Sequence, residues 1–308
     1  MKVIKPIWLT ICIATMLIVA LNVSAQVSYQ RILNAADEPG NWLTYNGGYS
    51  SQRYSRLDQL TPENVDQLQL QWTLQNQVFG AWQSNPIIVD GIMYVTERPN
   101  SVMALDAITG RVFWKYRHVP ADNALVCCGA NNRGVAVLGD KVFIGTLDAR
   151  LVALDRINGQ PLWNVEVGDV SLAYSVTMAP LAVKDKIIVG VGGGEYGIRG
   201  YVAAYDANTG KQAWKTYTIP GPGEPNHDSW QGDDWKHGGA PVWITGSFDP
   251  DLNLTYWGVG NPGPDWNAGQ RPGDNLYSDS VIALDADTGE LEWYFQFTPN
   301  DGYDYDSV

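Results

Sequence analysis

Alternating apolar and polar residues predict that this chain is built from short β-strands paired through tight turns. Segment 86–95 reads PIIVDGIMYV and places Asp90 and Gly91 between two apolar runs, which is a strong β-hairpin signal. Gly139 and Asp185 stand between further pairs of apolar runs. The first level of organisation is therefore a series of hairpins.

A second, longer motif occurs four times along the chain. Each copy has an Asp after two apolar residues, a Gly four positions after the Asp and a Trp four positions after the Gly. The copies are Asp106/Gly110/Trp114, Asp155/Gly159/Trp163, Asp206/Gly210/Trp214 and Asp285/Gly289/Trp293. Successive Asp residues are 49, 51 and 79 positions apart, and such a period is typical of propellers or solenoids rather than of a layered α/β domain.

Each copy of the motif predicts two strands joined by a turn, with Gly at the position that needs a left-handed backbone. The Trp would pack between neighbouring sheets, where its large apolar surface joins one unit to the next. Together with the hairpin before it, each copy supplies four strands, which is the content of one propeller blade. The expected fold class is all-β, a β-propeller of which roughly four blades are visible.

The third interval is longer because it contains an insertion, residues 221–239. Insertions in repeat proteins usually decorate one face, often the functional one. A content of 13 Trp, 16 Tyr and 32 Gly in 308 residues agrees with a turn-rich β protein. The formal charge of -13 disfavours binding to nucleic acid or anionic lipid, and suits a metal ion or a basic protein partner.

The first 25 residues have the features of a secretory signal peptide. Lys2 and Lys5 precede a run without charged residues, residues 7–21, and small residues precede the expected cleavage at Gln26. An uncleaved anchor is the alternative, but the run is short for a bilayer span. We therefore expect a periplasmic protein comprising residues 26–308, with no stable membrane span after cleavage.

Three strings resemble, in the same order, the quinone-binding and metal-binding segments of the methanol and ethanol quinoprotein dehydrogenases. They are residues 127–134 (CCGANNRG), residues 192–200 (GGGEYGIRG) and residues 258–264 (GVGNPGP). The resemblance runs from about Trp42 to the last residue and implies an eight-bladed β-propeller of which this chain covers roughly the N-terminal half.

The resemblance also implies an activity. Family members are alcohol dehydrogenases that use pyrroloquinoline quinone (PQQ) held by a metal ion. The implied reaction is oxidation of an alcohol, expected to be primary, to the aldehyde, with electrons passed to a cytochrome c type acceptor. The incomplete chain by itself is expected to be inactive.

The resemblance assigns the residues that bind PQQ. Cys127 and Cys128 match adjacent cysteines that form a disulfide against one face of the planar quinone, and Trp243 matches the indole on the other face. Two free buried thiols are the alternative, although an exported protein is disulfide-permissive. Arg133 and Thr177 match positions in the quinone plane, where its carboxylates need cationic and hydroxyl donors. The remaining expected contacts are Gly193, Gly194 and Gln83, the last at a position where many members have Glu.

The implied metal is Ca²⁺ or a lanthanide ion, both of which prefer oxygen ligands. The resemblance assigns Glu195, Asn261 and Asp304 as ligands, and Asp304 also as the catalytic base that accepts the alcohol proton. Asp306 matches a second Asp of the lanthanide-dependent relatives, and its extra charge would suit a trivalent ion. If segment 299–306 is extended, alternation places Asp304 and Asp306 on the same side. Taken alone, each of these residues could equally belong to a surface loop or turn.

Two other functions are compatible with the repeat alone. A non-catalytic propeller scaffold of the cell envelope would have similar Trp-docked blades, without adjacent cysteines or metal ligands. A PQQ-dependent sugar dehydrogenase would share the quinone but not the paired cysteines before Asn-Arg-Gly. Cys127 and Cys128 therefore favour the alcohol dehydrogenase.

Overall fold

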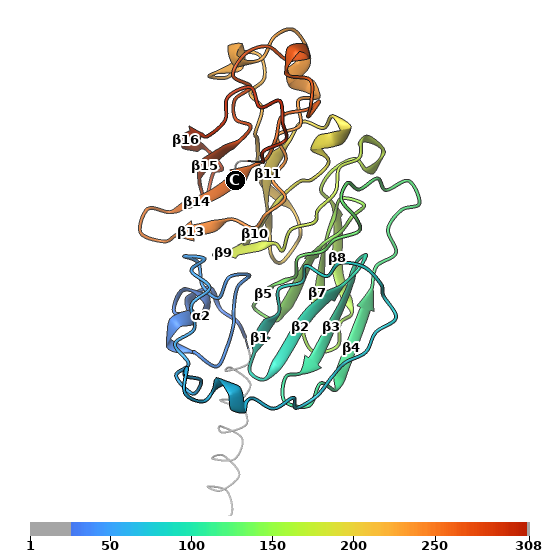
Figure 1. The fold of residues 1–308 in the computed structure, drawn as a ribbon, viewed down its shortest axis with the longest axis vertical. Coiled ribbons are helices and arrows are strands. Elements are labelled where there is room, and N and C mark those ends of the chain that lie inside the picture. The colour runs from blue at the N-terminus through green and yellow to red at the C-terminus, as the bar shows by residue number, and fades with distance from the viewer. Residues whose placement is uncertain (1–25, 307–308) are drawn as a thin grey trace, which may run out of the picture.

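The computed structural model describes residues 26–306, which form four antiparallel sheets of four strands each (Figure 1). The expected signal peptide lies outside the described residues. Each sheet is a meander, because its strands pair in the order in which they occur along the chain. The strands are β1 (Ile87–Val89), β2 (Ile92–Glu97), β3 (Ser101–Asp106), β4 (Val112–Arg117), β5 (Ala136–Leu138), β6 (Lys141–Gly145), β7 (Arg150–Asp155), β8 (Pro161–Glu166), β9 (Leu181–Val183), β10 (Lys186–Gly190), β11 (Tyr201–Asp206), β12 (Gln212–Tyr217), β13 (Ser247–Asp249), β14 (Leu254–Val259), β15 (Ser280–Asp285) and β16 (Leu291–Gln296). The expected all-β fold with four-stranded blades is confirmed.

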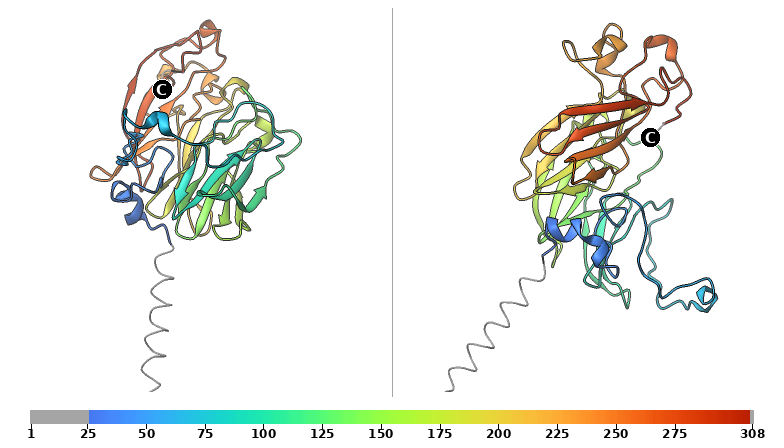
Figure 2. Two further views of the ribbon diagram at one scale, coloured as in Figure 1. Left: turned by 60° about the horizontal axis from the view of Figure 1, so that its bottom comes forward. Right: turned by 90° about the vertical axis from the view of Figure 1, so that its left-hand side faces the viewer.

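The helices are short. They are α2 (Tyr29–Leu33) and the 3₁₀ helices η1 (Ala35–Asp37), η2 (Val65–Gln67), η3 (Val170–Leu172), η4 (Gly194–Tyr196), η5 (His227–Ser229), η6 (Asp234–Lys236) and η7 (Ala268–Gln270). Within residues 26–306, no helix has the length and hydrophobicity needed to cross a bilayer. The segment that carries η2 extends away from the sheets (Figure 2, right).

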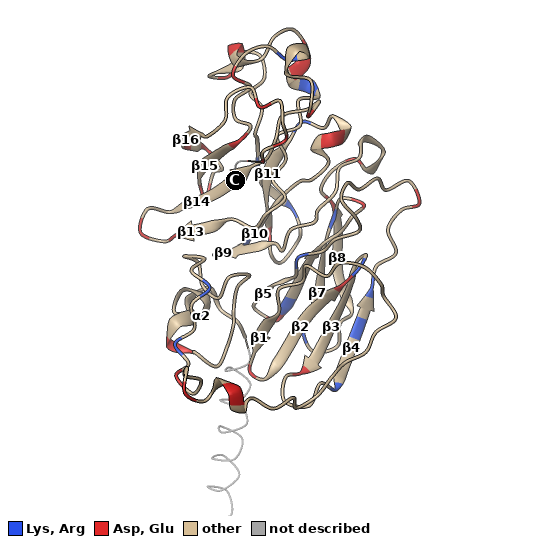
Figure 3. Ribbon diagram, viewed as in Figure 1, with Lys and Arg blue, Asp and Glu red and all other residues tan. Residues whose placement is uncertain are grey.

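The predicted hairpins form as expected. In the β1–β2 hairpin Val89 pairs with Ile92, and Asp90 and Gly91 between them both have positive φ, as a type I′ turn requires. The third strands β3, β7 and β11 are buried over most of their length, whereas the fourth strands β4 and β8 contain only exposed and partly buried residues. Charged residues lie mostly on loops and strand ends, so the sheets pack through apolar surfaces (Figure 3).

Consecutive blades are joined by the Trp of the fourth strand. The indole of Trp114 lies on Gly159, where an added Cβ would come within 2.5 Å of the ring, and its Nε1 donates to the Arg156 carbonyl at 3.1 Å. Trp163 and Trp214 make the equivalent contacts one and two blades further on. The expected docking role of these three Trp residues is confirmed.

Another docking Trp precedes the first sheet, and the repeat does not reveal it. Trp72 lies on Gly110 and donates to the Ala107 carbonyl at 3.2 Å. It has no Asp and Gly at the repeat spacing before it, so only its contacts identify it. Trp293 of β16 is 44% exposed, since no described sheet follows β16.

The insertion 221–239 is held to the third blade by Arg199. The Arg199 guanidinium lies 3.9 Å from the ring centroid of Tyr217 and 4.8 Å from that of Trp235. Its Nε and Nη2 both donate to the Ile219 carbonyl. The insertion is therefore an ordered part of the molecule at the end of the sheets where β11 begins.

Replacing Trp163 by Ala should lower the free energy of unfolding of the complete protein by about 3 kcal/mol, because loss of a packed aromatic ring leaves a cavity between two blades. Urea denaturation followed by circular dichroism measures this loss. Trp266 is 68% exposed, so the control Trp266→Ala should change stability by less than about 0.5 kcal/mol. Equal losses in the two variants would contradict the docking role.

Candidate functional site

Loops at one end of the sheets surround a cavity. In each blade the segment before the first strand and the segment after the second strand lie at the same edge, because the two strands are antiparallel. The cavity is lined by Val126, Cys127, Cys128, Gly129, Asn131, Arg133, Ser175, Thr177, Gly192, Gly193, Glu195, Pro241, Trp243 and Asp306. These residues come from segments before β5, β9 and β13 and after β10 and β16. The cavity therefore draws on three of the four blades.

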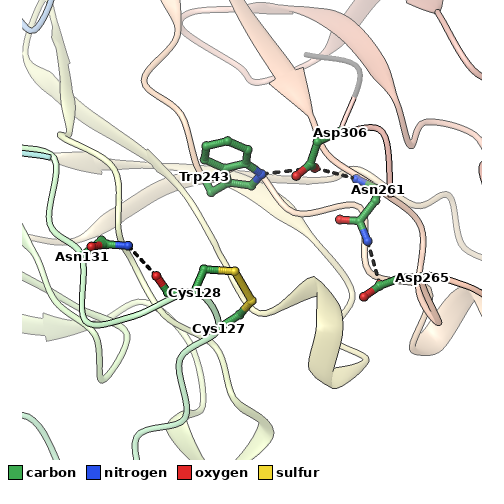
Figure 4. Close-up of a disulfide and its surroundings, with 7 residues drawn as sticks. All are labelled: Cys127, Cys128, Asn131, Trp243, Asn261, Asp265 and Asp306. Atoms are coloured by element: carbon green, nitrogen blue, oxygen red, sulfur yellow. Dashed lines mark hydrogen bonds between the residues drawn. A yellow bond between two sulfur atoms is a disulfide. The ribbon is translucent and has the colours of Figure 1, made fainter. Parts of the chain in front are cut away.

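Cys127 and Cys128 form a disulfide with each other, as the resemblance implies. The Asn131 side chain donates from Nδ2 to the Cys128 carbonyl at 2.8 Å and so holds the turn that carries the disulfide. Figure 4 shows the disulfide and the indole of Trp243 apart from one another, and both line the cavity. Two rigid surfaces of different chemistry are therefore presented to a ligand.

The loop before the disulfide is anchored by Asp148, which the sequence motifs do not identify. His118 Nε2 lies 2.8 Å from Asp148 Oδ1, Thr146 Oγ1 donates to it at 2.6 Å, and the Ala121 amide donates to Oδ2 at 3.2 Å. Burial by itself would raise the pKa of Asp148, but these hydrogen bonds hold it at about 2. Asp148 is therefore ionised at neutral pH and fixes the start of the loop.

One side of the cavity carries a guanidinium. Arg133 Nη1 donates to Thr177 Oγ1 at 2.9 Å, and the guanidinium lies 4.9 Å from the ring centroid of Trp243. Burial lowers the pKa of Arg133 because the charged form is removed from water. None of the ion pairs found within residues 26–306 involves Arg133. The side chain is thus a cation that faces the cavity without a carboxylate partner.

Carboxylates also lie at the cavity and beside it. Loss of hydration, together with the carboxylates of Asp265 and Asp306, raises the pKa of Glu195. Burial, followed by the repulsion of Asp306, Asp265 and Glu195, raises the pKa of Asp304 to about 6. Carboxylates that repel one another in this way would be stabilised by a cation among them.

Asp306, which lines the cavity, is in contact with Asn261. The Asn261 backbone N–H donates to Asp306 Oδ1 at 3.1 Å, and the Trp243 indole Nε1 lies 3.4 Å from the same oxygen (Figure 4). A Cβ at Gly260 would lie 2.4 Å from Asp306 Oδ1, so glycine is needed for this approach. Asn261 is 1% exposed, and its side chain Nδ2 donates to Asp265 Oδ1 at 2.7 Å.

The loop that carries Asp304 and Asp306 is not extended. Alternation would place the two side chains on the same side only in an extended segment, so that condition is not met. Asp304 has φ 59° and Asp306 φ 47°. Asp301 causes this turn, because its carboxylate accepts from the Tyr303 amide at 2.8 Å and from the Tyr305 amide at 2.6 Å. Local side-chain to backbone hydrogen bonds of this kind compete with an extended strand.

Arg271 is fully buried and joins the two acidic loops. Its guanidinium donates to the Pro264 carbonyl at 3.2 Å, to the Asp265 carbonyl at 3.3 Å and to the Asp301 carbonyl. The segment after β14 and the segment after β16 are therefore tied together by one cation. Arg271 and Asp301 lie outside the resembling strings, and only their contacts reveal them.

The other predicted residues lie in different surroundings. Gly193 lines the cavity, and a Cβ there would lie 2.3 Å from the Ala173 carbonyl oxygen. Gly194 is buried against Pro241, and Asp304 is partly buried beside the cavity without lining it. Gln83 is exposed and is not among the lining residues.

PQQ and a metal ion fit the donor set of this cavity. The Arg133 guanidinium and the Thr177 hydroxyl are donors suited to a carboxylate, and they lie beside an indole and a disulfide that could cover a flat ring. Glu195, Asn261 and Asp306 offer oxygen atoms of the kind that Ca²⁺ and lanthanide ions prefer. Arg133 lacks an anionic partner, which PQQ would supply. The carboxylates that repel one another lack a cation, which the metal ion would supply.

The chain is similar to several known dehydrogenases. It is 44% identical over 306 residues to quinohemoprotein alcohol dehydrogenase ADH-IIG of Pseudomonas putida, covering 93% of this chain and 42% of that protein. It is 40% identical over 302 residues to the lanthanide-dependent methanol dehydrogenase of Methylacidiphilum fumariolicum (strain SolV), covering 90% and 49%. Among solved structures, a europium-containing methanol dehydrogenase superposes with a TM-score of 0.85 at 39% identity, covering 91% of this chain and 52% of that one.

The matches also show how the length of this chain compares with that of its relatives. The chain spans about half the length of the relatives it matches. The sequence profile described as "PQQ: Glucose/ethanol/alcohol dehydrogenase, beta-propeller domain" matches residues 42–308. The chain belongs to the PQQ-dependent quinoprotein alcohol dehydrogenase family.

Proposed function

We propose that the whole protein is a periplasmic oxidoreductase that oxidises a primary alcohol to the aldehyde with metal-bound PQQ and passes electrons to a cytochrome c type acceptor. The observation that carries this proposal is the presence of both charges, without a partner of opposite sign, at one cavity. Arg133 lines the cavity without a carboxylate partner among the described residues, while Glu195, which also lines it, and Asp304 beside it have raised pKa values. A flat polycarboxylate bound together with a cation would neutralise both charges.

The binding roles follow from the contacts. Arg133 and Thr177 would hold a carboxylate of the quinone, while Trp243 and the disulfide would exclude water from its faces. Glu195, Asn261, Asp304 and Asp306 would hold the metal ion. When bound, the quinone supplies a hydride acceptor and the metal ion supplies Lewis acidity.

Asp304 would be the residue that moves the proton. Burial and neighbouring carboxylates raise its pKa to about 6, which makes the ionised form a stronger base than an ordinary Asp. The turn imposed by Asp301 holds the backbone on both sides of Asp304. Asp304 would accept the hydroxyl proton of the alcohol.

Two features of the chain support the proposed location. The first 25 residues have the composition of a signal peptide, and a disulfide between neighbouring cysteines is compatible with an oxidising compartment. The cytochrome c type acceptor follows from the family resemblance alone.

A lanthanide ion is the metal we favour. Glu195, Asp304 and Asp306 together would bring three carboxylates to one ion, and a trivalent ion about the size of Ca²⁺ is better matched by that charge. Two of the similar proteins are described as lanthanide-dependent and europium-containing, which supports the same choice.

Asp304→Asn in the complete enzyme should lower turnover about 10³-fold, because an amide cannot accept the alcohol proton. Dye-linked alcohol oxidation measures turnover, and PQQ absorbance measures retention of the quinone, which should stay close to wild type. Asp251→Asn, in the exposed β13–β14 turn, is the control with the same change of charge. Near-normal turnover would remove Asp304 from the mechanism.

Arg133→Met should weaken PQQ binding to the apoenzyme by roughly tenfold to hundredfold, the usual effect of losing a hydrogen bond to a charged group. Equilibrium titration with PQQ, followed by quenching of Trp fluorescence, gives the affinity. Arg111→Met, at an exposed turn, should leave the affinity unchanged. If both variants bind like wild type, Arg133 does not hold the quinone.

Lanthanum as the sole added metal should support faster alcohol-dependent dye reduction than calcium does, and Asp306→Ala should shrink that advantage. The reason is the extra anionic oxygen that Asp306 offers to a trivalent ion. Parallel reconstitution of the apoenzyme with each metal measures the ratio of rates. Equal or greater activity with calcium, unaffected by the substitution, would identify a calcium enzyme.

A further inference from the structure

Asp265 is close to the proposed metal ligands, yet it belongs to none of the roles described so far. It stands one residue after the resembling string 258–264. Its Oδ1 accepts from Asn261 Nδ2 at 2.7 Å, and the side chain is only partly exposed. The contact therefore links a carboxylate directly to the amide expected to bind the metal.

An amide side chain can present either of two ends to a ligand. Only Oδ1 can bind a cation, because Nδ2 carries two hydrogens and no lone pair available for a metal. An ionised carboxylate is an acceptor, so its contact with Asn261 selects the orientation in which Nδ2 faces Asp265. Figure 4 shows this arrangement, with the Asn261 amide oxygen directed away from Asp265.

The backbone on both sides of this contact is fixed independently. The Asn261 backbone N–H donates to Asp306 Oδ1 at 3.1 Å, and the Asn261 backbone carbonyl accepts from the Ala240 backbone N–H at 2.9 Å. Arg271, fully buried, holds the Asp265 carbonyl at 3.3 Å. With both backbones held, the remaining freedom of Asn261 is the rotation of its side chain, and the Asp265 contact removes it.

We infer that Asp265 is a positioning residue of the metal centre. Its carboxylate turns the Asn261 oxygen toward Gly194, the residue before Glu195, where a Cβ would lie 3.7 Å from that oxygen. It also adds negative charge behind the ligand, which favours a trivalent over a divalent cation. A hydrogen bond from the amide to a carboxylate also increases the electron density on the ligating oxygen. The inference rests on the proposed function, since it assumes that Asn261 binds a metal ion.

Substitution can separate the two contributions of Asp265. Asp265→Asn keeps an acceptor oxygen for Asn261 and removes the charge. Asp265→Ala removes both the charge and the acceptor. Asn261→Ala gives the reference value for a site that has lost its amide ligand, and Asp251→Asn is the control for net charge.

Terbium binding to the metal-free full-length protein provides a measurement that does not depend on turnover. Luminescence sensitised by nearby Trp gives the affinity, competition with calcium gives the preference between the ions, and lifetimes in H₂O and D₂O give the number of water molecules on the ion. For Asp265→Asn we expect terbium affinity to fall about tenfold to hundredfold, calcium affinity to fall less, and the number of waters to stay constant. For Asp265→Ala we expect about one additional water, as in Asn261→Ala.

The outcomes separate this inference from the function on which it rests. Failure of the wild-type protein to bind terbium near Trp would overturn the metal centre and the positioning role with it. Wild-type binding that is unchanged in affinity, ion preference and water number by both Asp265 substitutions would overturn the positioning role alone. Circular dichroism confirms folding, and Asp265→Asn, which is nearly isosteric, keeps the test decisive if Asp265→Ala does not fold.

Discussion

The contact between a Trp of one blade and a Gly of the next is the interaction on which the rest of the structure depends. Indole and turn meet so closely that a single methyl group at Gly159 would overlap Trp114. The indole N–H also satisfies a carbonyl of the following turn. Because this contact recurs at the same place in each blade, it sets the spacing between sheets, and the loops at the far end of the sheets inherit that spacing.

The cavity is a consequence of this regular spacing. A blade presents the entry of its first strand and the exit of its second strand at one edge, so each blade delivers two loops to the same end of the molecule. Arg133 and Thr177 come from entry loops and Glu195 from an exit loop, and all three line the cavity. Asn261, from another exit loop, is buried and does not line it. Residues far apart in the sequence meet here because the sheets, which are rigid, place them together.

Much of this arrangement could be predicted from the sequence, and the reasons for success and failure differ. The blades follow from local patterns, since hairpin signals and the Asp–Gly–Trp spacing act within a few residues. Trp72 lacks that spacing and could not be found. Asp148 and Arg271 bind groups of segments far away along the chain, and no local pattern specifies which group a buried side chain reaches. The turn at Asp304 was missed for a different reason. It is imposed locally by the Asp301 side chain, and the alternation of an extended strand takes no account of such bonds.

The contacts that hold Arg133 and the acidic loops argue for a bound ligand rather than for a purely structural role of these charges. A partly buried guanidinium and a group of carboxylates attract each other and would be expected to pair. Instead Arg133 is held by a hydroxyl and an indole, while the acidic loops are held by Asp301 and Arg271. None of these contacts supplies Arg133 with an anion or the carboxylates with a cation, so both charges remain available to a ligand. Perturbed charges left unpaired in this way are typical of functional sites. A metal complex of an anionic cofactor would supply both the anion and the cation that this cavity lacks.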